Sequence, residues 1–157
     1  MRAHLRIELK SMSSETVAVR QEYNSVLRGG ADLLARLFSG QGAAITHMVV
    51  GTSDVPESDA FGTTALTGPT EVPISADAFQ IDPPDPVKRV VRVRVRGTVP
   101  AATALGTIRE AALLSRSGDT ATLYNRVTFA PIEKTADHEL TLFWEVGFPY
   151  GDLQWLL

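Results

Sequence analysis

Apolar and polar residues alternate at the start of the chain, which is the pattern of a half-buried strand. Between residues 4 and 10 every second residue is apolar, namely Leu5, Ile7 and Leu9. Successive side chains of a strand point to opposite faces, so these three would share one face. A second short extended segment is predicted around residues 17–19, where two valines alternate with an alanine.

Between residues 25 and 39 the apolar positions recur every three or four residues, which is the period of a helix. The residues that would share one helical face are Val26, Leu27, Leu33, Leu34, Leu37 and Phe38. Gly40 can end the helix in a left-handed conformation. Gly29 and Gly30 each weaken a helix by roughly 1 kcal/mol relative to alanine. We therefore expect the helix to begin nearer Ala31.

Most of the remaining pattern predicts strands. The predicted segments are Ile45–Val50, which is apolar on both faces, and Val87–Val99, Thr107–Leu114, Thr122–Phe129 and Glu139–Phe148. A turn at residues 117–119 would join the third segment to the fourth. Pro131 forces a corner after the fourth, so we expect the last two segments to form a long hairpin with a kinked connection.

Residues 51–86 differ in composition from the rest of the chain. They hold six of the nine prolines, seven acidic residues and no basic residue. We expect a long acidic, proline-rich loop with one short strand near Glu71–Ile74. A loop of this length in a compact domain is usually functional or ordered by a partner.

These elements together predict the fold class. Strands outnumber helices and no strand–helix–strand unit repeats, so we expect a mainly β fold with one packed α-helix. Its antiparallel sheets would pack as a β-sandwich. With 157 residues, 44% hydrophobic and 21% charged, the chain can bury one core. We predict a single β-rich structural domain at residues 1–148, followed by a C-terminal apolar docking tail at residues 149–157.

Composition excludes several classes of site. There is no cysteine, which removes disulfides, thiolate metal sites and thiol nucleophiles. The net charge of −3 is too small to imply a strongly charged partner for the whole molecule. The first ten residues alternate, and no segment approaches the ~18 apolar residues that cross a bilayer. We therefore expect neither a signal peptide nor a membrane partner, and synthesis in the cytoplasm.

Candidate catalytic and metal-binding groups do not form a pattern. The histidines His4, His47 and His138 fall in three different predicted strand contexts, and no G-x-S-x-G nucleophile turn is present. Neighbouring residues of a strand point to opposite sides, so the run 137–139 (Asp-His-Glu) does not converge on one metal. The acidic loop lacks the spacing of a dedicated calcium loop. We expect no catalytic residue, no metal and no cofactor.

One charged stripe stands out. Arg92, Arg94 and Arg96 would project from one face of an extended strand at about 7 Å intervals, with two further basic residues at 88–89. Three interpretations remain open: docking to an acidic protein surface, a solvated strand face, or contact with nucleic acid phosphates. Aromatic side chains that could stack on bases are missing beside the stripe, and the molecule is net acidic. Both observations argue against nucleic acid as the partner.

The C-terminus is apolar. Four large side chains end the chain, namely Leu153, Trp155, Leu156 and Leu157. Such a patch is buried either on its own domain or in a neighbouring subunit. The predicted partner-binding residues are therefore the three arginines of the stripe and these four residues.

Arg109 and Glu110 occupy adjacent positions of a predicted strand, so they point to opposite faces and cannot pair with each other. We expect one of them to meet Arg126 or Glu145 across a sheet.

Three segments resemble motifs of small phage virion proteins. ITHMVVGTSD (residues 45–54), with TAL at 64–66 and Glu71, is similar to "I-x-x-hydrophobic-hydrophobic-G-T-G … T-A-L-x-x-E". GTIREAALLS from Gly106 resembles "G-x-I-x-E-A-G-L-F". The most specific segment, LYNRVTFAPIEKTADHELTLFWEVGF from Leu123, resembles "L-x-x-R-x-x-F-x-P-I-x-K-x-x-x-D-x-L-T-x-x-W-x-x-x-F". The chain departs from these motifs at two positions. No second glycine follows Thr52, and Ala112 stands where the motif has glycine.

The resemblance covers residues 26–148 and implies assembly instead of catalysis. Such proteins are tail-fibre, baseplate or other tail-associated structural proteins, with relatives in contractile injection systems. Together with the absence of a catalytic pattern and the apolar C-terminus, it leads us to predict a homo-oligomeric subunit, located in a virion or phage-tail-like particle, that contacts itself and other particle proteins. A capsid-decorating or neck protein, and a nucleic-acid-binding module that uses the arginine strand, are the alternatives.

Overall fold

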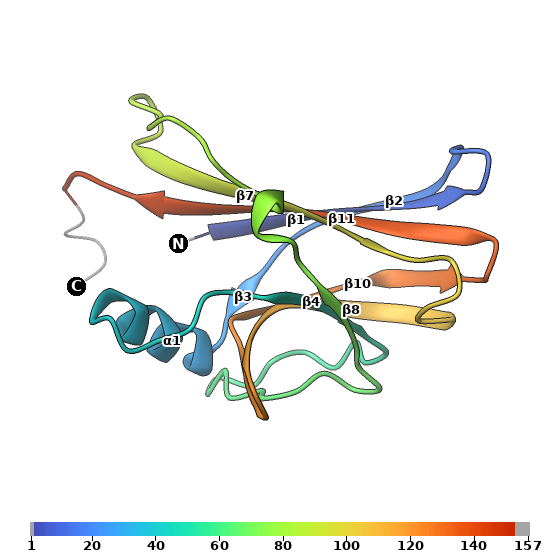
Figure 1. The fold of residues 1–157 in the computed structure, drawn as a ribbon, viewed down its shortest axis with the longest axis horizontal. Helices are drawn as coiled ribbons and strands as arrows, with labels where there is room; N and C mark the ends of the chain where they lie inside the picture. Colours follow the sequence, from blue (N-terminus) through green and yellow to red (C-terminus); the bar gives the residue numbers. More distant parts are fainter. Residues whose placement is uncertain (1, 153–157) are drawn as a thin grey trace.

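The computed structural model describes residues 2–152 and shows two antiparallel sheets packed face to face with one helix (Figure 1). The prediction of a mainly β, sandwich-like fold is therefore confirmed. The elements are β1 (Arg2–Ser11), β2 (Thr16–Tyr23), β3 (Ser25–Val26), α1 (Arg28–Phe38), β4 (His47–Gly51), β5 (Thr70–Pro73), a 3-10 turn (Ala76–Ala78), β6 (Phe79–Ile81), β7 (Val90–Val99), β8 (Gly106–Ser117), β9 (Thr120–Leu123), β10 (Asn125–Lys134) and β11 (His138–Pro149).

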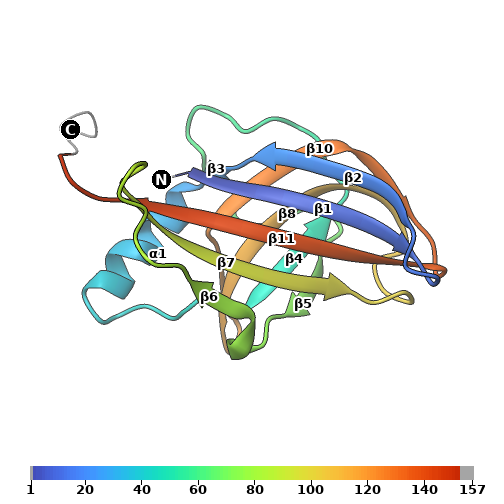
Figure 2. The same ribbon diagram turned by 90° about the horizontal axis from the view of Figure 1, so that it is seen from above.

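The first sheet has the strand order β2-β1-β11-β7-β6 (Figure 2). β11 lies at its centre and pairs along its length with β1 on one side and β7 on the other. Arg2 of β1 faces Gly147 of β11, so the start of β1 and the end of β11 lie side by side. The alternate apolar residues of both strands point inward, as their pattern predicts.

The second sheet has the order β3-β10-β8-β4-β5, and β9 pairs with β8 beside this path. The main core lies between the two sheets. Its side chains come from both, including Leu5, Ile7, Met48, Leu113, Leu142 and Trp144.

The loop at residues 52–69 forms a partial third layer, because it covers the outer face of the second sheet (Figure 1). A smaller apolar cluster lies beneath it. In this cluster Leu66 of the loop packs with Val49 and Leu114 of the sheet, and all three are buried. Residues 51–86 also contain two short strands: β5, which was predicted, and β6, which was not.

The helix α1 lies at one end of the sandwich, near the start of β7 and the end of β11 (Figure 1). It begins at Arg28, so the prediction of a start near Ala31 is wrong. Gly30 faces the backbone carbonyl of Tyr124, where an added Cβ would collide with main-chain atoms. The helix therefore requires a glycine here, although glycine weakens it locally.

The end of α1 agrees with the prediction. Gly40 has a φ of +77°, and the N–H of Gln41 donates to the carbonyl of Arg36 at 2.7 Å. This is a Schellman termination, which a glycine permits. The buried face of α1 is narrower than the spacing of its apolar residues predicts, because Leu33 is buried but Phe38 is 94% exposed.

One connection differs from the sequence prediction. β10 and β11 do not form a hairpin, because β10 belongs to the second sheet and β11 to the first. Residues 135–137 therefore arch from one sheet to the other. Pro131 lies inside β10, where the pairing with β8 shifts register between Thr128 and Ile132. The kink that proline was expected to cause is thus an irregularity within the strand.

No helix in the described part of the chain has the length and apolar character to span a bilayer.

Candidate functional site

The arginine stripe lies on β7, on the face of the first sheet that points away from the core. Arg92 pairs with Asp85 at 3.2 Å and with Glu145 at 3.0 Å. Arg94 pairs with Asp82 at 2.9 Å. Two of the three predicted partner-binding arginines therefore already have carboxylate partners within the chain.

Arg96 has a different environment. Its guanidinium lies 5.4 Å from the centre of the Phe143 ring, in a cation–π arrangement. It has no carboxylate partner among residues 2–152. Phe143 is placed there because β11 pairs with β7, with Phe143 directly opposite Arg96. On the other side of Phe143, β1 brings Arg6 into the same row.

The expectation that no aromatic side chain accompanies the stripe is therefore wrong. A shallow hollow of about 420 Å³ lies over this row, and its lining includes His4, Arg6, Arg94, Arg96, Phe143 and Glu145. Sequence alternation places Phe143 on the outer face of its strand. Only the pairing of β7 with β11 places it against the arginines.

The acidic residues of segment 51–86 mostly bind arginines of the same chain. The five ion pairs are Asp54–Arg109, Glu57–Arg126, Glu71–Arg116, Asp82–Arg94 and Asp85–Arg92. These pairs attach the segment to the strands at intervals along its length. Most of its negative charge is thereby matched within the domain.

Two of these carboxyls titrate below their ordinary range. A hydrogen bond from the backbone N–H of Lys88 is the main cause that lowers the pKa of Asp85, and Arg92 and the N–H of Val87 lower it further. The bidentate contact with Arg116, at 2.7 and 2.8 Å, lowers the pKa of Glu71.

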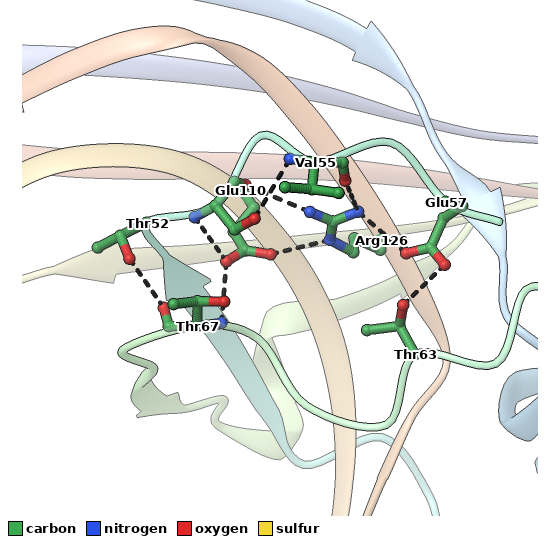
Figure 3. A network of polar contacts seen from close by, with 8 residues as sticks. Thr52, Val55, Glu57, Thr63, Thr67, Glu110 and Arg126 are labelled. Carbon is green, nitrogen blue, oxygen red and sulfur yellow. Dashed lines mark hydrogen bonds and ion pairs between the residues drawn. The ribbon is translucent and has the colours of Figure 1, made fainter.

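A buried charge network lies under the loop at residues 52–69 (Figure 3). Arg126 of β10 contacts Glu110 of β8 at 2.8 Å and Glu57 of the loop at 3.0 Å. The three side chains are only 5%, 1% and 8% exposed. The prediction that Arg109 or Glu110 meets Arg126 or Glu145 across a sheet is confirmed for Glu110 and Arg126.

The network joins both arms of the loop to the sheet. Glu110 Oε2 accepts hydrogen bonds from the backbone N–H of Ser53 at 2.9 Å and of Thr67 at 3.0 Å. Arg126 donates to the carbonyl of Val55 at 2.7 Å, and Thr63 donates to Glu57 at 2.7 Å. All four carboxylate oxygens of Glu110 and Glu57 therefore have donors. This arrangement positions the loop.

The same network explains part of the virion-like motifs in physical terms. Gly51 lies so close to Glu110 that a Cβ on it would press against the carboxylate. The N–H of Thr52 donates to the carbonyl of Thr67 at 3.0 Å, and its hydroxyl donates to the same carbonyl at 3.3 Å (Figure 3). The motif residues at 51–53, at Glu110 and at Arg126 thus converge on one structural feature.

Lys134 is a buried residue that sequence reasoning missed. It is 2% exposed and donates to the backbone carbonyls of Pro100, Ala101 and Thr103 at 2.8, 3.0 and 2.6 Å. Burial lowers the pKa of its ammonium group. The side chain caps the turn between β7 and β8. Its position within the virion-like motif was the one available signal.

The histidines lie in three separate places. His4 lies 5.4 Å from the ring of Tyr23, His47 contacts Thr46 at 2.8 Å, and His138 contacts Thr135 at 3.0 Å. Within residues 2–152 no three His, Cys, Asp or Glu side chains are grouped so that they could hold a metal ion.

An apolar groove opens at the end of the sandwich where α1 lies. It has a volume of about 90 Å³, and its lining includes Leu33, Leu34, Leu37, Phe79, Val93 and Phe148. The predicted partner-binding residues Leu153, Trp155, Leu156 and Leu157 lie outside the described residues. Their role stays a prediction.

Comparison of the chain with protein-family models, with curated proteins and with solved structures gives no match. Function is therefore inferred from the residues and their geometry.

Proposed function

We propose that the protein is a non-enzymatic structural subunit of a phage tail, baseplate or tail-fibre assembly, or of a related contractile particle. In this role it binds copies of itself and neighbouring particle proteins, and it uses no cofactor. The resemblance of residues 26–148 to virion motifs supports the proposal. So does the network of Glu110 and Arg126, because it shows that motif residues serve to fix a surface loop.

The observation that carries the proposal is the apolar character of one end of the sandwich. Phe38 is 94% exposed, Val87 is 88% exposed and Ile81 is 71% exposed. They belong to the end of α1, the loop before β7, and β6. Exposed large apolar side chains favour contact with another protein.

The arginine stripe is the second proposed contact. Arg96 and the Phe143 ring offer a cationic and aromatic surface that an acidic neighbour could meet. Arg92 and Arg94 are already paired with carboxylates. A nucleic acid backbone would have to displace these pairs on a net acidic protein, so the geometry favours a protein partner.

The test combines self-association with particle binding. The purified protein is measured by light scattering over a range of concentrations and then mixed with particles assembled without it. We expect oligomers and incorporation into the particle. A stable monomer that joins no particle contradicts the proposal. Electron microscopy of the complete particle then separates a tail or baseplate position from the neck or capsid surface.

The arginines are tested separately. Replacement of Arg92, Arg94 and Arg96 by serine is expected to weaken particle incorporation. Tight, salt-sensitive binding of duplex or single-stranded DNA, lost in the same variant, would favour the nucleic acid alternative instead.

A further inference from the structure

The apolar groove beside α1 is open at the end of the molecule. Leu34 and Leu37 of α1 form one wall, and Val93 of β7 and Phe148 of β11 form the other. Apolar side chains dominate this lining, which also includes Tyr124. A concave apolar surface of this kind suits an apolar ligand.

The chain leaves the domain at the rim of this groove. β11 ends at Pro149, directly after Phe148 of the groove wall. The next residue is held in place, because Tyr150 donates its N–H to the carbonyl of Arg89 at 3.0 Å and its hydroxyl to the carbonyl of Asp85 at 3.2 Å. The four apolar side chains of residues 153–157 begin three residues after this anchor. The point from which the donor segment continues and the acceptor groove thus lie at the same end of the molecule.

The exposed residues around the groove indicate which molecule supplies the segment. Leu37 lines the groove, and its neighbour Phe38 is 94% exposed. Val87, next to the Tyr150 anchor, is 88% exposed. Five residues that fold back into their own groove span at most about 17 Å, which limits the area they cover around these two side chains. Two copies that meet end to end can cover them.

We propose that the groove of one copy binds residues 153–157 of a second copy, and that the exchange is reciprocal. Because donor and acceptor lie at one end, a two-fold axis at this end lets each copy fill the groove of the other and closes the assembly as a dimer. This inference rests on the proposed assembly function and names one of its contacts.

The experiment compares four forms of the protein by sedimentation velocity over a concentration series. They are the wild type, a truncation after Asp152, Leu37→Glu, and the matched control Leu105→Glu. Leu37 is 37% exposed, so a glutamate there can reach water and leave the fold intact. Leu105 is 58% exposed and lies at the opposite end, between β7 and β8. Circular dichroism checks that each variant is folded.

We expect the wild type and Leu105→Glu to form dimers, and the other two to self-associate at least about tenfold more weakly. Mixing supplies the decisive result. The truncated form keeps a groove and lacks a segment, whereas Leu37→Glu keeps the segment and lacks a competent groove. Together they should form a mixed dimer through one contact, although neither dimerises alone.

Three results would overturn the inference. If the wild type is a monomer whose Trp155 fluorescence changes in Leu37→Glu, the segment occupies its own groove. If the dimer persists in both variants, another surface forms it, and the proposed function stands without this contact. If folded truncated protein and folded Leu37→Glu fail to form a mixed dimer, the segment does not bind the groove. Particle incorporation is measured in parallel, so that its loss or persistence tests the proposed function separately.

Discussion

Glu110 of β8 and Arg126 of β10 form an ion pair at 2.8 Å that is almost completely buried. Arg126 also reaches Glu57 of the covering loop at 3.0 Å, so one guanidinium serves two carboxylates. Charges removed from water are costly unless every lone pair and proton has a partner. Here the loop backbone supplies those partners. The loop at residues 52–69 and the sheet beneath it should therefore be stable only together.

Glu110→Gln tests this dependence. The substitution leaves Arg126 with one carboxylate instead of two, and we expect it to lower the free energy of unfolding by about 3 kcal/mol. Chemical denaturation measures the loss. Limited proteolysis should show earlier cleavage within residues 52–69, because the N–H groups of Ser53 and Thr67 lose their charged acceptor.

The matched control is Glu71→Gln. It removes the carboxylate partner of Arg116, which lies on β8, the same strand as Glu110. Both side chains of that pair are 33% exposed. Exposed ion pairs contribute about 1 kcal/mol or less. Equal losses in the two variants would show that burial of the Glu110 network does not matter.

Gly29 and Gly30 offer a second matched comparison within one helix. An alanine at position 30 would place its Cβ against the backbone of Tyr124, whereas at position 29 it would meet Thr122 at an ordinary 3.5 Å. We expect Gly30→Ala to destabilise the protein by about 2 kcal/mol or more. Gly29→Ala should stabilise it by up to about 1 kcal/mol. Thermal unfolding of both variants measures the difference, and a neutral Gly30→Ala would contradict the close approach.

Strand positions could be predicted from the sequence because alternation is a local property. The inward residues of β1, Leu5, Ile7 and Leu9, were identified in this way. Which strands pair with each other was harder to predict from the sequence. Residues 135–137 are short enough for a hairpin and equally suit an arch between sheets, so the pattern did not reveal that β10 and β11 belong to different sheets. β6 was missed because three residues are too few to show a period.

Lys134→Met tests the cap of the β7–β8 turn. Methionine keeps the apolar length of lysine but cannot donate to the carbonyls of Pro100, Ala101 and Thr103. Since hydrogen bonds from a charged donor contribute about 1.5–3 kcal/mol, we expect a loss of about 2 kcal/mol in unfolding free energy. Amide hydrogen exchange should be faster in residues 100–105. Unchanged exchange there would mean that the turn holds without the cap.

The acid dependence of stability should include a contribution from Asp85. Its pKa is lowered from the ordinary 3.8, chiefly by the Lys88 N–H. A carboxyl whose pKa is lower in the folded state stabilises the fold above 3.8, and the contribution is lost as the pH falls through the folded value. Asp85→Asn should therefore be less stable than wild type at neutral pH, with a difference that shrinks in acid. Denaturation at several pH values measures this, and a constant difference would contradict it.

The candidate site was predictable only in part. Pairing of Glu110 with Arg126 follows from the need of a buried charge for a partner on a neighbouring strand. The contribution of Glu57 depends on the path of the loop, which no periodic pattern encodes. The contact of Phe143 with Arg96 depends on the register of β7 with β11. Both are tertiary properties.

The neighbouring positions of Arg2 and Gly147 have a mechanical consequence. β1 and β11 run antiparallel, so tension applied between Arg2 and Pro149 would peel the ladder apart from one end. Its ten residue pairs would open in succession instead of sharing the load. Pulling a single molecule through these two positions should open it at a lower force than pulling it through positions at opposite ends. An assembly that loads this subunit mechanically would therefore need to hold it by its faces.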